Sequence, residues 1–140
     1  PEIHPRSSSR ESDRLHLATK LRRADFAISQ FFFEAGHYLR LVDEMSALGV
    51  DKPIIPGIMP VTNLSQVERM AKLSGAMFPE WLSVRLAAAK DPHEVRRIGV
   101  ETATQLCAEL LAAGAPGLHF YTLNQSEPTL RLWRNLGLPT

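Results

Sequence analysis

The sequence has little cysteine, almost no surplus of charge and no long apolar run. Its single cysteine, Cys107, excludes an internal disulfide framework and a zinc site built from several cysteines. Sixteen basic against fifteen acidic residues give a net charge of +1, so no overall field favours nucleic acid or an acidic membrane. No apolar stretch reaches the roughly 18 residues of a membrane span. We therefore predict a cytoplasmic protein with no nucleic-acid or membrane partner.

The sequence also has no glycine-rich phosphate loop, and its five histidines do not show the spacing of metal ligands. We therefore predict no bound metal. The 140 residues are 44% hydrophobic and 22% charged, which is ordinary for a globular protein with one core.

Apolar residues recur with strand and helix periodicity in alternation. These patterns predict helices at 12–21, 37–49, 62–75, 78–90, 91–114 and 126–137, and strands at 24–33, 52–59 and 117–123. The strand at 24–33 is apolar on both faces, as in a buried parallel strand. The prolines of 52–59 suit its ends better than its centre. Alternation of strands with helices predicts an α/β fold with three parallel strand–helix units.

The size of the chain limits which α/β fold is possible. A complete (β/α)₈ barrel needs about 250 residues, and three strands alone leave both edges of a sheet open. The sequence therefore predicts the second half of such a TIM barrel. In its first helix, Leu15, Ala18 and Leu21 are expected to form the buried side.

Four short motifs follow one another along the chain: PEIHP at 1–5, ISQFFFEAGHYLR at 28–40, PGIMPVTNLSQ at 56–66 and LHFYTLN at 118–124. Together they resemble the carboxyl-terminal half of methylenetetrahydrofolate reductase. The resemblance implies a flavin barrel in which NADH or NADPH reduces FAD, and reduced FAD converts 5,10-methylenetetrahydrofolate to 5-methyltetrahydrofolate. It implies a role in one-carbon and methionine metabolism. Residues 1–140 would be the carboxyl-terminal half of one barrel domain whose amino-terminal half is absent from this chain.

The same resemblance implies that His4, Asp13, Lys20 and Leu123 contact FAD. Asp13 and Lys20 are seven residues apart, about two helical turns, and so share one helix face. A carboxylate there suits the ribose hydroxyls, and a cation suits the diphosphate. The simpler interpretations are a histidine held in a proline-rich turn and a solvated charged face.

The resemblance also implies that Gln30, Gln66, Met70 and Gln125 contact folate. Gln30 interrupts an apolar run, where a buried amide needs partners such as the pterin ring or, alternatively, other core groups. Gln66 equally suits the third position of a helix that Asn63 caps. Met70 stands where enterobacterial enzymes carry phenylalanine and lacks a flat stacking face. Gln125 replaces a folate-binding arginine, so we expect the anionic folate tail to bind more weakly or through another cation.

No catalytic residue is assigned to this chain, because the family's general acid, a glutamate, belongs to the other half of the barrel. We expect the 140 residues alone to be inactive and the protein with its amino-terminal half to be the reductase, which can form homo-oligomers. One alternative is a non-catalytic fragment that binds flavin or folate, or associates with itself through open barrel edges. Another is a different (β/α)₈ enzyme that shares parts of the pattern.

Overall fold

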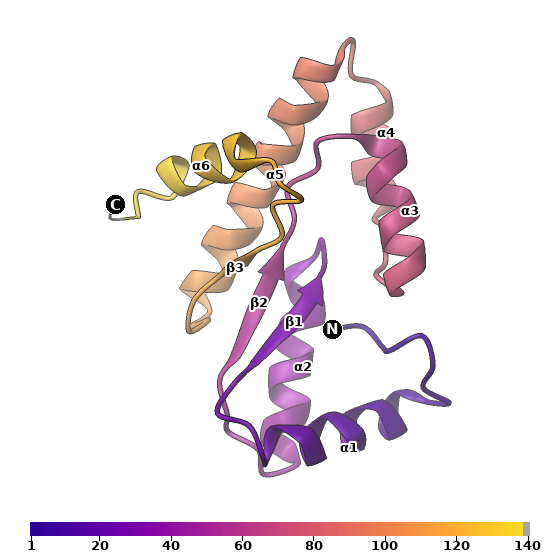
Figure 1. The fold of residues 1–140 in the computed structure, drawn as a ribbon, viewed down its shortest axis with the longest axis vertical. Helices are drawn as coiled ribbons and strands as arrows, with labels where there is room; N and C mark the ends of the chain where they lie inside the picture. Colours follow the sequence, from indigo (N-terminus) through magenta and orange to yellow (C-terminus); the bar gives the residue numbers. More distant parts are fainter. Residues whose placement is uncertain (139–140) are drawn as a thin grey trace.

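The computed structural model describes residues 1–138, which form an α/β fold around one parallel sheet (Figure 1). The elements are α1 (Arg10–Leu21), β1 (Ala27–Phe31), α2 (Ala35–Ala47), β2 (Ile54–Ile58), α3 (Leu64–Ser74), α4 (Glu80–Ala87), α5 (Pro92–Ala112), β3 (His119–Phe120) and α6 (Ser126–Asn135). The strands pair in parallel in the order β1–β2–β3. The predicted α/β class and three parallel strands are therefore confirmed.

The buried core has two parts that α5 joins. One cluster combines apolar residues of α1, α2, β2, α5 and α6, and the other lies beneath α3 and α4 next to the carboxyl ends of β1 and β2. Gly99 lets α5 approach the chain that follows β2, since a Cβ atom there would lie 1.9 Å from the carbonyl oxygen of Val61. This close contact requires glycine at position 99.

The first strand is shorter than predicted, and one of its faces is not covered. Ser29 and Phe31 are buried, whereas Phe26 is 52% exposed and Ile28 is 44% exposed. The expectation of burial on both faces is therefore wrong for residues 1–138. The physical reason is that alternate side chains of β1 point to opposite faces, and the face that carries Ile28 and Gln30 borders an open cleft.

Pro56 lies in the middle of β2. The expectation that the prolines lie at the ends of this strand is therefore wrong for Pro56. The register between β1 and β2 shifts between Ile28 and Phe31, so the ladder of hydrogen bonds is irregular there. Gly57 N–H donates to the buried hydroxyl of Ser29 at 3.0 Å. A proline without an N–H group is tolerated at such an irregularity.

The first helix begins two residues earlier than predicted, because the Ser9 hydroxyl caps it by accepting a hydrogen bond from a backbone N–H. Its buried side consists of Arg14, Ala18 and Leu21. Leu15 is 51% exposed, so the predicted apolar side is wrong at that position. The buried residues follow i, i+4, i+7 spacing, and they place an arginine in the buried stripe.

The last strand is only two residues long, but the chain after it is held firmly across the sheet. The Tyr121 hydroxyl donates to the carbonyl of Ser29 in β1 at 3.0 Å. Its ring lies against Gly57 of β2, where an added Cβ atom would come within 2.7 Å of Tyr121 Cε2. Tyr121 therefore connects the ends of all three strands.

Candidate functional site

A cleft of about 940 Å³ lies beside β1, between α1, the amino-terminal segment and the end of α3. We call it the first cleft; residues 1–7, 13, 14, 16, 17, 20, 28–30, 41, 73 and 74 line it. Four of the eight predicted site residues are among them: His4, Asp13, Lys20 and Gln30. The fold therefore brings together residues that are up to 26 positions apart in the sequence.

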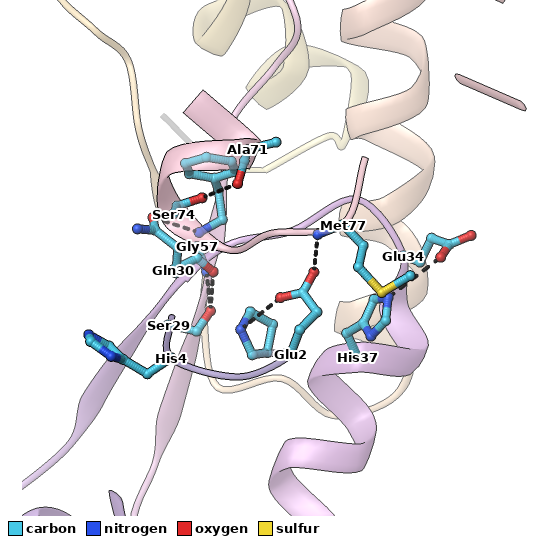
Figure 2. A network of polar contacts seen from close by, with 12 residues as sticks. Glu2, His4, Ser29, Gln30, Glu34, His37, Gly57, Ala71, Ser74 and Met77 are labelled. Carbon is cyan, nitrogen blue, oxygen red and sulfur yellow. Dashed lines mark hydrogen bonds and ion pairs between the residues drawn. The ribbon is translucent and has the colours of Figure 1, made fainter. Parts of the chain in front are cut away.

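His4 is exposed in a turn whose backbone is fixed by hydrogen bonds. Its N–H donates to Asp13 Oδ1 at 3.1 Å, and its ring nitrogen Nδ1 accepts the N–H of Arg6 at 3.1 Å. Figure 2 shows the imidazole extending away from the side chain of Glu2. Because Nδ1 already accepts a hydrogen bond, Nε2 of the neutral ring carries the proton and can donate to a ligand.

The Asp13 carboxylate accepts more hydrogen bonds from the protein than the sequence suggests. One carboxylate oxygen accepts from His4 N and from the Ser7 hydroxyl, and the other accepts from Arg14 at 2.6 Å. A carboxylate has about four acceptor positions, so one remains for a ligand hydroxyl. Lys20 lies on the same helix, is exposed and has no ion pair within residues 1–138. Its ammonium group is therefore available to an anion in the first cleft.

Arg14, which sequence reasoning missed, is the centre of this polar network and is only 5% exposed. Its guanidinium donates to Asp13 Oδ2 at 2.6 Å, to Glu44 Oε2 at 2.5 Å and to the carbonyls of Pro1 and Glu2 at 2.6 and 3.0 Å. One side chain thus ties the amino-terminal segment to α1 and α2. Its position in the buried stripe of α1, four and seven residues before two apolar residues, was the signal available in the sequence.

Glu44 of α2 is shared by two arginines. Arg10 donates to both of its carboxylate oxygens, at 2.8 and 3.2 Å, and Arg14 donates to one of them. Burial of Glu44 acts to raise its pKa, but the hydrogen bonds and charges of Arg10 and Arg14 outweigh this effect and lower the pKa below its ordinary value. The carboxylate is therefore held ionised.

The amino-terminal segment is also fixed against the end of α3 and the chain that follows it. Glu2 is 9% exposed, and its carboxylate accepts the N–H of Met77 at 3.0 Å, as the dashed line in Figure 2 shows. Gly75 ends α3 with a φ of +73°, and an added Cβ atom would lie 2.9 Å from Pro5 Cγ. The turn that carries His4 is therefore held from both sides.

Gln30 lies in β1 and lines the first cleft, but it is exposed. The expectation of a buried amide is wrong, because the face of β1 that carries Gln30 is the uncovered one. The side-chain oxygen of Gln30 accepts the N–H of Phe31 at 3.1 Å, which leaves its NH₂ group to donate into the cleft.

Gln66 and Met70 of α3 do not line the first cleft. Gln66 is exposed, and its backbone N–H donates to the Asn63 side chain at 3.0 Å, so the predicted helix cap by Asn63 is confirmed. Met70 is partly buried and packs against the core cluster beneath α3 and α4. Met70 thus has a packing role in α3, whereas Gln66 contributes its backbone N–H to the helix cap.

Leu123 follows β3 in an unusual turn. Leu123 and Asn124 have φ angles of +48° and +62°, and the N–H of Gln125 donates to the carbonyl of Thr122 at 2.8 Å. Left-handed backbone is uncommon for a residue other than glycine, and such strain tends to gather at functional sites. The side chain of Leu123 is 44% exposed.

Gln125 lies in a separate cleft between the beginnings of α5 and α6. This second cleft has a volume of about 420 Å³ and is lined by His93, Arg96, Val100, Gln125, Ser126, Glu127, Pro128 and Arg131. Gln125 therefore shares this cleft with two arginines and one glutamate. The other three predicted site residues outside the first cleft, Gln66, Met70 and Leu123, do not line it.

Other reactive groups are remote from both clefts. Cys107 is fully buried in α5, and burial raises the pKa of its thiol to about 12. Residues 1–138 contain no group of three His, Cys, Asp or Glu side chains placed to hold a metal ion. In the same part of the chain, every helix is too short or too polar to cross a membrane.

Comparison with known proteins gives one consistent family. The family model for methylenetetrahydrofolate reductase matches residues 1–137. The 5,10-methylenetetrahydrofolate reductase of Salmonella typhimurium is 36% identical over 140 residues, which cover 99% of this chain and 47% of that protein. Methylenetetrahydrofolate reductase (NADH) 1 of Arabidopsis thaliana is 34% identical, with 99% of this chain and 25% of that protein covered. The chain thus spans about half the length of the bacterial relative.

Proposed function

From the fact that the chain belongs to the methylenetetrahydrofolate reductase family, we propose that it is part of an oxidoreductase that converts 5,10-methylenetetrahydrofolate to 5-methyltetrahydrofolate with NADH or NADPH. FAD, when bound, supplies the hydride relay between the nicotinamide and the folate. The residues of this chain bind and orient the two partners. The protein is proposed to act in the cytoplasm, in one-carbon and methionine metabolism.

The observation that carries the proposal is the meeting of His4, Asp13, Lys20 and Gln30 in the first cleft. The donor set fits a flavin dinucleotide: Lys20 offers a cation to the diphosphate, and His4 Nε2 offers a hydrogen-bond donor. The remaining acceptor position of Asp13 suits a ribose hydroxyl. These three side chains are assigned to FAD.

Gln30 is assigned to the pterin ring of folate. The pterin presents nitrogens and a carbonyl along one edge, and the free NH₂ group of Gln30 can donate to them from β1. Gln66 and Met70 are assigned to the same substrate from α3. Since both lie outside the first cleft, their contact with folate depends on how the substrate extends over the carboxyl ends of the strands.

Leu123 is assigned to FAD through its backbone. Its positive φ supports this role, because a left-handed leucine is costly and needs a compensating advantage, such as a carbonyl or N–H group aimed at a ligand. Tyr121 holds the start of this turn in place, because its hydroxyl donates a hydrogen bond to the carbonyl of Ser29 in β1.

Residues 1–140 are proposed to be the second half of a (β/α)₈ barrel. The parallel order β1–β2–β3 leaves two strand edges to be paired, and the exposed Ile28 lies on the edge strand β1, with the exposed Phe26 directly before it. An amino-terminal half of the barrel would cover them and complete the first cleft. A homo-oligomer of whole barrels is part of the same proposal.

The proposed reductase activity is tested on the protein that contains this chain, expressed from its gene. We expect it to take up FAD, seen as the visible flavin absorption band, and to oxidise NADH or NADPH only when 5,10-methylenetetrahydrofolate is added. The 140 residues expressed alone are expected to show no turnover. A protein that takes up flavin without turning over either dinucleotide would favour the non-catalytic alternative, and one that binds neither flavin nor folate would overturn the proposal.

A further inference from the structure

Two consecutive arginines of α5, Arg96 and Arg97, differ in their ion-pair partners. Arg97 pairs with Glu94 at 3.4 Å and with Glu101 at 3.3 Å, and Arg85 of α4 also reaches Glu101 at 3.0 Å. Arg96, one residue away, has no hydrogen bond or ion pair within residues 1–138 and lines the second cleft. Consecutive arginines therefore have different surroundings: Arg97 belongs to a surface ion-pair network, and Arg96 has no such partner within residues 1–138.

The second cleft gathers further donors around Arg96. His93 precedes it by nearly one helical turn on the same face, and the side chain of Gln125 on the opposite wall makes no hydrogen bond within residues 1–138. Arg131 also lines the cleft but forms an ion pair with Glu127 on α6. Glu127 therefore balances Arg131, and the charge of Arg96 has no counterion in the cleft.

The position of the cleft indicates which anion it meets. Gln125 comes five residues after β3, and the parallel strands place the end of β3 at the same edge of the sheet as Gln30. A substrate whose ring lies at Gln30 and whose tail runs along this edge would bring the tail toward the second cleft. Folates carry two carboxylates at that end, and a guanidinium binds a carboxylate through two parallel hydrogen bonds.

We propose that the second cleft binds the glutamyl carboxylates of the folate substrate, with Arg96 supplying the cation that position 125 lacks. This inference rests on the proposed function. His93 and the Gln125 amide add hydrogen-bond donors beside the guanidinium. Val100 is buried and lines the same cleft, where it gives the carbon chain of the tail an apolar contact.

The test compares two folates that differ only in the tail: the reduced substrate with its glutamate, and the pteroate form without it. Dissociation constants are measured by calorimetry on the gene-encoded protein that contains the chain. Arg96→Gln is expected to weaken binding of the glutamyl form about tenfold, the value of one charge-assisted contact. It should leave binding of the pteroate form unchanged.

Arg97→Gln is the matched control, because it removes the same charge from the next residue without touching the cleft. Equal effects of Arg96→Gln and Arg97→Gln, or equal affinity of the unaltered protein for both folates, would overturn the inference. A weaker affinity for NADH or NADPH in Arg96→Gln, with the folates unaffected, would assign the cleft to dinucleotide phosphates and overturn it as well.

Binding and turnover are read separately, so the two proposals fail differently. Absence of turnover in the unaltered protein would contradict the reductase function, while the two dissociation constants would still decide what the second cleft binds. If turnover is present, Arg96→Gln should raise KM for the glutamyl substrate and leave kcat as it was, since the contact is remote from the reacting atoms.

Discussion

The two clefts are built in opposite ways. In the first cleft, the candidate ligand-binding groups are tied to a buried network: Asp13 accepts three protein donors, and Arg14 connects three segments of the chain. In the second cleft, Arg96 and Gln125 have no side-chain partners within residues 1–138. The comparison teaches that the first cleft couples binding to the stability of the fold, whereas the second can change its ligand preference at little structural cost.

The largest expected effect follows from removing the centre of the first network. Arg14→Leu would leave the Glu44 carboxylate with one arginine and two backbone carbonyls without their donor, and we expect it to lower the free energy of unfolding by about 2–4 kcal/mol. Urea unfolding measures this change. FAD affinity should fall together with it, because the turn that carries His4 loses its anchor.

Arg10→Leu is the control for this prediction, since Arg10 bonds the same carboxylate from a side chain that is 38% exposed. Its effect should stay below about 1 kcal/mol. Equal destabilisation by the two variants would show that burial of Arg14 adds nothing and would remove the contrast between the clefts.

The next effect concerns the second cleft alone. Gln125→Arg adds a cation beside Arg96, and we expect it to tighten binding of the glutamyl folate by up to about tenfold. Because both arginines would then share one anion, Arg96→Gln should matter less in this background than in the unaltered protein. Calorimetric titration of the single and double variants measures this coupling, and strict additivity would contradict a shared ligand.

A smaller effect is expected for the open cation of the first cleft. Lys20→Gln should weaken FAD binding about three- to fivefold, as for an exposed ion pair, and change unfolding by less than about 0.5 kcal/mol. Quenching of flavin fluorescence gives the affinity. Riboflavin, which has no diphosphate, should bind equally to both proteins, and Lys52→Gln outside the cleft should have no effect; a loss of riboflavin binding would argue against the diphosphate contact.

The smallest effect is a change in the acid stability of the first network. The pKa of Glu44 is lowered in the folded protein, so this carboxylate stabilises the fold above its unfolded pKa of about 4.3, and the contribution is lost as the pH falls through the lowered value. Urea unfolding between about pH 5 and pH 3 should therefore show a steeper loss for the unaltered protein than for Glu44→Gln. Parallel curves would mean that Glu44 does not contribute to this loss.

Much of the architecture could be predicted from local patterns. The periodicity of apolar residues located the six helices and three strands of residues 1–138, and the Asn63 cap of α3 followed from its spacing to Gln66. These features depend on contacts between residues close in sequence. The four motifs likewise identified the family, because each is a contiguous stretch of the chain.

The sequence by itself therefore determined the element order, the parallel sheet and the family, which arise from local preferences and contiguous motifs. Only the tertiary structure decided that Arg14 replaces Leu15 on the buried side of α1, that Gln30 is exposed and that Gln125 meets Arg96. Each of these outcomes depends on which segment packs against which. Such contacts join residues far apart along the chain, and residue spacing alone does not determine them.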